Sequence, residues 1–157
     1  WAVSQGADEV DIVISRGKLI EGNEKEVFDE ILRLREAASG AHLKVILETG
    51  ELLTPQLIHA ASTLAINAGA DFIKTSTGKI QPAATLPAFL LMIDAINEYR
   101  QSGGRNIGIK AAGGISDVEV ALDYYKLVYY ELGEEYLHPS LFRIGASRLA
   151  DKLGALL

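Results

Sequence analysis

The chain has 157 residues, of which 48% are hydrophobic and 23% are charged. This is the composition of a globular protein large enough for one domain with a sizeable core. Its formal net charge of −6 argues against nucleic acid or an anionic membrane as a partner. The chain has no cysteine, which excludes disulfides and thiolate metal sites. We expect a cytoplasmic protein in which residues 1–157 form one domain.

Five short apolar segments alternate with longer segments of helical periodicity. The predicted strands, in chain order, are Glu9–Ile14, Leu43–Glu48, Phe72–Ser76, Ile107–Ala111 and Phe142–Gly145. A Gly-Ala-Asp sequence precedes the first and the third of them, which is a weak internal repeat. Regular alternation of strands and helices predicts a parallel sheet covered by helices.

Capping signals mark where the intervening helices begin and end. Asn23 with Glu26, and Ser116 with Glu119, fit capping boxes, whereas Thr54 and Thr85 fit N-caps that precede a proline. Left-handed glycines are expected to end helices at Gly69 and Gly103–Gly104. The last helix is expected to begin at about Ser147.

The number of β/α units leaves two architectures open. An open five-stranded sheet would fit the length, whereas a closed barrel needs eight strands and about 250 residues. Residues 1–8 look like the last turns of a helix, which favours the larger fold. We therefore expect a (β/α)8 TIM barrel, of which this chain holds the last five β/α units and lacks the first three.

Charged residues occur inside three of the apolar strands. Lys74, Lys110 and Asp11 each lie in a different predicted strand, and both faces of a parallel β/α sheet are covered. One such lysine could equally be a structural ion pair or reach solvent past the strand end. Two lysines beside a carboxylate indicate chemistry, because desolvation and like charge favour the neutral amine, which can form a Schiff base with a carbonyl.

Glycine-rich turns follow the last three strands. They read TSTGK at 75–79, AAGGIS at 111–116 and IGAS at 144–147. Backbone amides in such turns bind phosphate, especially where a helix begins behind them. The first turn lacks the upstream glycine of a Walker A loop. Together the three turns predict a sugar-phosphate site.

The segments GADEVDIVI, LKVILETGEL, GADFIKTSTGK, IGIKAAGGI and LFRIGAS resemble, in order, those of the deoxyribose-phosphate aldolase family. The resemblance covers essentially the whole chain. It implies a barrel-shaped class I aldolase that needs no metal or other cofactor and interconverts 2-deoxyribose 5-phosphate with glyceraldehyde 3-phosphate and acetaldehyde. It further implies that Lys74 forms the Schiff base, and that Lys110 and Asp11 take part in proton transfer. The residues implied in substrate and phosphate binding are Lys44, within an inner charge network, and Gly78, Lys79, Gly113, Gly114, Gly145 and Ser147.

The chain departs from the family pattern at two positions. Ser116 stands where the family commonly has arginine, and Arg148 stands where it often has serine or threonine. The alternatives to this aldolase are another class I sugar-phosphate aldolase or lyase on the same barrel, or a non-catalytic fragment that binds phosphate or self-assembles. The partner expected is a sugar phosphate, not nucleic acid or membrane, and a homo-oligomer remains open.

Overall fold

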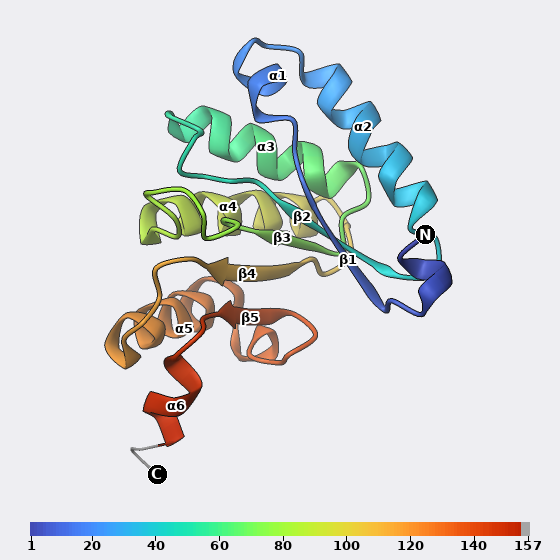
Figure 1. Ribbon diagram of the computed structural model, residues 1–157. Helices are drawn as coiled ribbons and strands as arrows, with labels where there is room; N and C mark the ends of the chain where they lie inside the picture. Colours follow the sequence, from blue (N-terminus) through green and yellow to red (C-terminus); the bar gives the residue numbers. More distant parts are fainter. Residues whose placement is uncertain (155–157) are drawn as a thin grey trace.

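Five parallel strands lie side by side in chain order in the computed structural model, which describes residues 1–154 (Figure 1). The strands are β1 (Glu9–Val13), β2 (His42–Ile46), β3 (Phe72–Lys74), β4 (Gly108–Ala112) and β5 (Phe142–Gly145). The helices are η1 (Val3–Gln5), α1 (Arg16–Ile20), α2 (Glu24–Ala37), α3 (Pro55–Asn67), α4 (Leu86–Gln101), α5 (Val118–Leu132), η2 (Glu134–Tyr136) and α6 (Leu149–Gly154). All five predicted strands are confirmed, with ends shifted by at most two residues.

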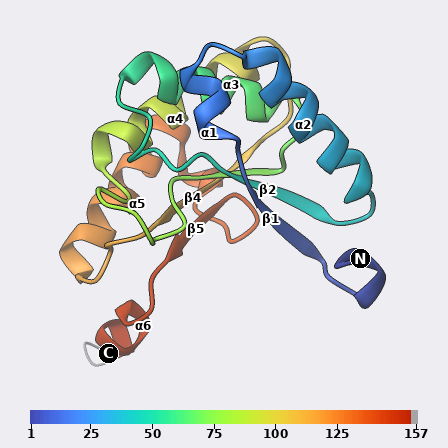
Figure 2. The same cartoon turned by 45° about the horizontal axis from the view of Figure 1, so that its top comes forward.

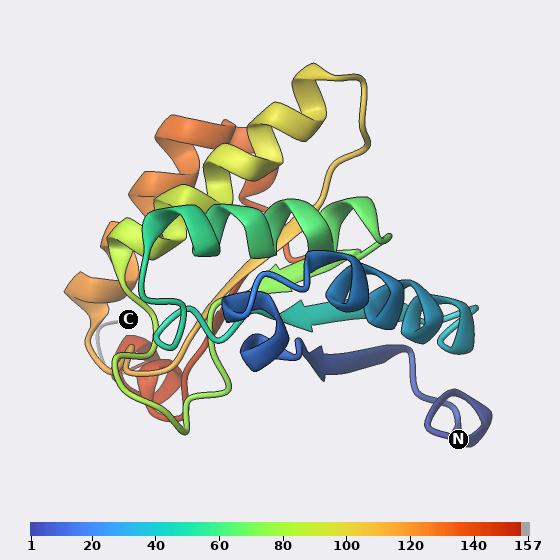
Figure 3. The ribbon, with the colours of Figure 1, turned by 90° about the horizontal axis from the view of Figure 1, so that it is seen from above.

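The long helices α2 to α5 cover one face of the sheet and form an arc around it (Figures 2 and 3). The strand order β1-β2-β3-β4-β5 has no reversal. A doubly wound open sheet would reverse its strand order and carry helices on both faces, whereas a barrel keeps sequential order with helices outside. The barrel type of α/β fold is therefore confirmed, and the flat open sheet is not observed.

Two of the predicted helix caps are confirmed and two are wrong. The Thr54 and Thr85 hydroxyls accept hydrogen bonds from the amides of Leu57 and Ala88. Asn23 precedes α2 as predicted, but its side chain makes no cap. Its NH2 group donates to Glu21, and Glu26 pairs with Lys18.

The second predicted capping box is displaced along the chain. Asp117, not Ser116, occupies the N-cap position of α5, and the Ser116 hydroxyl donates to the Asp117 carboxylate. At the helix ends, Gly69 and Gly103 have φ values of 95° and 88°, as expected of left-handed glycines. The last helix begins at Leu149 and not at Ser147.

The hydrophobic core lies between the convex face of the sheet and the helices. Leu43, Val45, Ile73 and Ile109 point into it and are fully buried. Phe89 of α4 packs edge-on against Tyr124 of α5, with ring centroids 5.0 Å apart. Alternation along a strand then places Lys44, Phe72 and Lys110 on the opposite, concave face. The helical period of α2 predicts that Leu34 faces inward with Val27 and Ile31, but Leu34 is 37% exposed whereas Val27 and Ile31 are buried.

A contact between the first and last strands shows how strongly the sheet curves. The Arg143 guanidinium of β5 binds the Glu9 carboxylate of β1 through two pairs of atoms, each 2.7 Å apart. In a flat sheet these strands would be about 19 Å apart, at four spacings of about 4.8 Å. The guanidinium also lies over the Phe72 ring, 4.5 Å from its centroid. Glu9, Phe72 and Arg143 come from alternate strands, as the side chains of one barrel layer do.

Candidate active site

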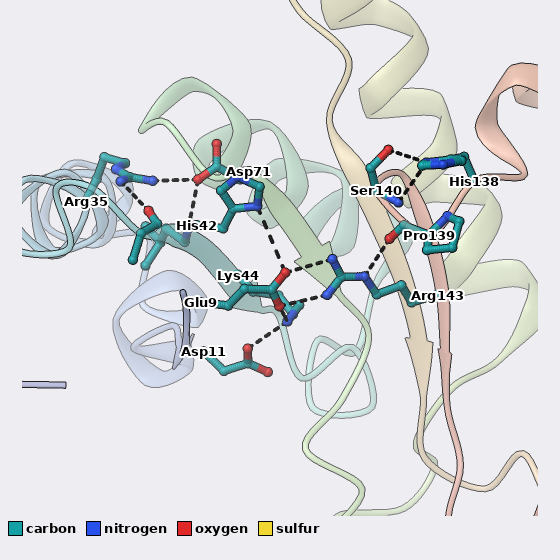
Figure 4. Close-up of polar contacts among 12 residues, drawn as sticks. Glu9, Asp11, Arg35, His42, Lys44, Asp71, His138, Pro139, Ser140 and Arg143 are labelled. Atoms are coloured by element: carbon teal, nitrogen blue, oxygen red, sulfur yellow. Dashed lines mark hydrogen bonds and ion pairs between the residues drawn. The ribbon is translucent and has the colours of Figure 1, made fainter. Parts of the chain in front are cut away.

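A chain of ion pairs runs along the concave face from β1 to β3. The Lys44 ammonium donates to Glu9 at 2.8 Å and to Asp11 at 2.9 Å (Figure 4). The second oxygen of Asp11 accepts a hydrogen bond from Lys74 at 3.1 Å. Lys44 is buried and Lys74 is partly buried, with 5% and 14% of their side chains exposed. The structure thus brings Asp11 and Lys74 together, as the resemblance implies.

Asp11 is held in its charged form by the two lysines. Burial alone would raise the pKa of Asp11, but the hydrogen bonds from Lys44 and Lys74 outweigh it and lower this pKa below its usual value. The carboxylate therefore stays ionised near neutral pH, where it can accept a proton or orient an ammonium group.

Lys110 is the exception in this cluster. It lies beside Lys74 in the register of β3 and β4, and within residues 1–154 it makes no ion pair with a carboxylate. Burial lowers the pKa of Lys110 first, and the positive charges of Lys74 and Lys44 lower it further. These effects favour the neutral form of Lys110 relative to that of an ordinary lysine.

Glu9 and Arg143 complete the charged cluster and were not predicted from the sequence. Glu9 lies two residues before Asp11, and Arg143 lies two residues before Gly145, so each shares the concave face with a residue that was identified. This two-residue spacing in the sequence could have identified both residues as part of the site. What sequence could not show is that these two residues, 134 positions apart, meet across the sheet.

A pocket of about 520 Å³ opens at the carboxyl ends of β3, β4 and β5. Lys74 and Lys110 lie in its wall. The remaining lining residues come from the three glycine turns: Thr77, Gly78, Ala112, Gly113, Gly114, Ile115, Ser116, Gly145, Ala146 and Ser147. The two lysines and the predicted phosphate turns therefore belong to one site.

The three turns differ in the amides that they leave for a ligand. In the first turn, the amides of Thr77, Gly78 and Lys79 already donate to Glu48, to Ser76 and to Thr77, respectively. Gly113 and Gly114 have φ values of 96° and 78°. In the part of the chain that the structure describes, their amides and that of Ser147 make no hydrogen bond with the protein. Backbone amides without a protein partner thus lie in the turns after β4 and β5.

Two of the residues implied in phosphate binding lie outside the pocket wall. Lys44 belongs to the ion-pair chain, and Lys79 is exposed; neither lines the pocket. Of the two departures from the family pattern, Ser116 lines the pocket, whereas Arg148 does not. A missing arginine at position 116 therefore affects the pocket directly.

The described residues hold no group of three or more acidic or histidine side chains placed to bind a metal ion. None of the helices within residues 1–154 combines the length and the apolar character needed to cross a bilayer.

Comparison with known proteins gives the same assignment for residues 1–125, which match the model of the DeoC/LacD family of aldolases. Human deoxyribose-phosphate aldolase is 48% identical over 152 residues, covering 97% of this chain and 48% of that protein. The chain spans about half the length of the curated relatives it matches.

Solved structures agree with the fold. A crystal structure from Toxoplasma gondii ME49 aligns with 98% of this chain and 61% of that one, with 28% identity and a TM-score of 0.88. The structure of QR15, an aldolase, aligns with 99% of this chain and 63% of its own, with 29% identity and a TM-score of 0.75. The five β/α units therefore occur within longer chains of the same architecture.

We predict that Glu9 makes the unfolding free energy depend on pH in the acidic range. Hydrogen bonds from Arg143 and Lys44 lower the pKa of Glu9 from 4.5 to about 2. A carboxyl group with a depressed pKa stabilises the fold above its unfolded pKa, and this contribution is lost as the pH falls from 4.5 to about 2. Over this range the wild type should lose about 2 kcal/mol more unfolding free energy than Glu9→Gln, a figure reduced for partial exposure.

Urea unfolding of the complete natural polypeptide at a series of pH values measures this difference. Asp29→Asn is the control, because Asp29 forms only an exposed pair with Lys25, and it should keep the wild-type slope. Equal slopes for the wild type and Glu9→Gln would contradict the assignment.

Proposed function

The chain belongs to the DeoC/LacD aldolase family, and we propose that it carries the active site of a Schiff-base aldolase that interconverts 2-deoxyribose 5-phosphate with glyceraldehyde 3-phosphate and acetaldehyde. One observation carries the proposal: Lys74 is hydrogen-bonded to Asp11 and lies beside Lys110, a lysine whose pKa is lowered, in the wall of a pocket with free backbone amides. The human relative bears the name of this activity.

In the proposed reaction, the Lys74 amine attacks the C1 aldehyde of the open-chain sugar. Water leaves, and a protonated imine remains. A base removes the proton of the C3 hydroxyl, the C2–C3 bond breaks, and its electron pair passes into the imine to give an enamine and glyceraldehyde 3-phosphate. The enamine is protonated at C2, and water then releases acetaldehyde from Lys74.

Lys110 and Asp11 are the groups proposed to move these protons. Lys74 reaches the nucleophilic amine by giving up a proton, and neutral Lys110 is the neighbouring acceptor supported by its lowered pKa. Asp11 touches Lys74 directly and stabilises the positive imine that forms there. Lys44 orients the other Asp11 oxygen.

We propose that the phosphate binds at the turns after β4 and β5, through Gly113, Gly114, Gly145 and Ser147. Their place in the pocket wall supports this. Gly78 also lines the wall. Lys79 is exposed and lies outside the wall, so it would contribute only through its positive charge. The partner is thus a small sugar phosphate, and the absence of cysteine suits a reaction in the cytoplasm.

We also propose that residues 1–157 form one domain that three further β/α units complete. Supporting this, β1 and β5 each have a neighbour on one side only, and the relatives are about twice as long. The other candidate, a different class I aldolase on the same barrel, would keep the lysine chemistry and differ in the sugar.

We predict that borohydride will fix acetaldehyde to Lys74. Reduction of the imine in the complete natural polypeptide should inactivate it and leave an N-ethyl group in the peptide that contains Lys74. The variant Lys74→Arg should take up no label, and Lys79→Arg, which changes an exposed lysine of the same turn, should be labelled like the wild type. A label on Lys110 would reassign the nucleophile.

We predict that a negative charge at Gly114 will weaken binding of the phosphorylated sugar. Gly114→Asp should raise KM for 2-deoxyribose 5-phosphate at least about tenfold by like-charge repulsion, with little effect on 2-deoxyribose. Gly22→Asp is the matched control, because Gly22 also has a left-handed φ, of 83°, and open space around it. Equal use of the two sugars by the wild type would exclude a phosphate site.

We predict that residues 1–157 expressed alone will self-associate and show little activity. The two edge strands and the concave face would be open to other molecules. A displacement of about 1 Å of the reacting groups can cost roughly 10²-fold in rate. Light scattering and turnover should both recover when three upstream β/α units are added. A monomeric 157-residue protein with the full rate would contradict this proposal.

A further inference from the structure

Glu48, two residues after the end of β2, combines a buried charge with an unusual backbone. Among the described residues it is the sole non-glycine residue with a positive φ, of 55°. Its side chain is only 1% exposed. A left-handed conformation is unfavourable for a residue with a side chain, and such positions cluster at functional sites. The reaction proposed above does not use this carboxylate.

The backbone around Glu48 departs from the regular ladder. The amide of Leu47 donates to the carbonyl of Lys74 at 2.9 Å, and the amide of Thr49 donates to the carbonyl of Thr75 at 2.9 Å. In a regular parallel ladder, successive hydrogen bonds lie two residues apart on both strands. Here the donors after β2 lie two residues apart, whereas the acceptors at the end of β3 lie one residue apart. Glu48 is the extra residue of a bulge, a device that re-aims a side chain.

The Glu48 carboxylate binds Thr77, a residue of the TSTGK turn that lines the pocket. One oxygen accepts from the Thr77 amide at 3.1 Å, and the other accepts from the Thr77 hydroxyl at 2.6 Å. The same hydroxyl accepts a hydrogen bond from the Lys79 amide at 3.2 Å. Glu48 thus fixes both the backbone and the side chain of Thr77, which lies in the pocket wall.

Arg16, at the start of α1, offsets the charge of Glu48. Its guanidinium lies 3.7 Å from Glu48 and 3.0 Å from Glu51. The loops after β1, β2 and β3 are therefore joined through one carboxylate. A negative charge near a phosphate pocket would by itself repel the ligand. Glu48 must therefore have a second, favourable effect if the pocket binds phosphate.

We infer that Glu48 is a positioning residue for the phosphorylated end of the substrate, and that it acts by holding Thr77 and Gly78 in the pocket wall. This inference rests on the proposed function. Glu48 then has two opposing effects on phosphate binding. Its negative charge weakens binding, whereas its hydrogen bonds to Thr77 strengthen binding by holding the pocket wall in place.

The variant Glu48→Gln separates the two effects. Glutamine replaces one of the two accepting oxygens with an NH2 group, so in the present geometry one of the two hydrogen bonds from Thr77 is lost. KM for 2-deoxyribose 5-phosphate should therefore rise about tenfold, with kcat within about twofold. KM for 2-deoxyribose should stay unchanged. If only the charge mattered, the same variant would lower KM for the phosphorylated sugar. These kinetics are measured on the complete natural polypeptide.

Two further variants make the test specific. Thr77→Val keeps the Glu48 charge and removes the hydroxyl, so it should raise the same KM, and it serves alone if Glu48→Gln does not fold. Glu51→Gln removes a charge beside Arg16 without contacting Thr77, so it should match the wild type. A KM that falls, stays unchanged or rises equally for both sugars overturns the role of Glu48.

Failure of the proposed function would be visible separately. A wild-type protein that does not cleave 2-deoxyribose 5-phosphate would sink that proposal, while titration with inorganic phosphate still tests Glu48. NMR shifts of the Gly113 and Gly114 amides should then give an affinity about tenfold weaker in Glu48→Gln and in Thr77→Val. Unchanged phosphate affinity in both variants would overturn the inference.

Discussion

An excess of buried positive charge on the concave face of the sheet is the constraint on which the site depends. Four cations, Lys44, Lys74, Lys110 and Arg143, share two carboxylates, Glu9 and Asp11. Both carboxylates are ionised and fully used by their partners, which leaves two positive charges uncompensated. Such a cluster lowers its free energy either by releasing a proton from one lysine or by binding an anion. The proposed reaction needs both, a neutral amine and a bound phosphate.

The ion pair between Glu9 and Arg143 ties this chemistry to the shape of the sheet. The pair joins strands that are four positions apart, and in an eight-stranded barrel such strands face each other across the axis. Below the guanidinium, Phe72 fits because Gly108 has no side chain; a Cβ there would lie 2.4 Å from the ring. Curvature therefore lets the pair form, and the pair in turn holds Lys44, and through it Asp11, in place.

Much of the fold and part of the site could be predicted from the sequence. Strands, parallel order and the N-caps at Thr54 and Thr85 follow from local signals: apolar runs, β/α alternation and a threonine before proline. The lysines and Asp11 stand out because a charge inside an apolar strand is costly. Glu48 could not be recognised, because nothing in a glutamate predicts a left-handed backbone. The engaged Thr77 amide of the TSTGK turn was equally hidden, since its acceptor is Glu48 from another loop.

The distribution of groups over the strands fixes how a sugar phosphate would lie. Carboxylates come from β1, free amides come from the turns after β4 and β5, and Lys74 of β3 lies between them. Gly145 widens the amide side, because a Cβ there would lie 3.0 Å from the Lys110 side chain. A phosphate bound at the β4 and β5 turns would direct the aldehyde end of the sugar toward Lys74.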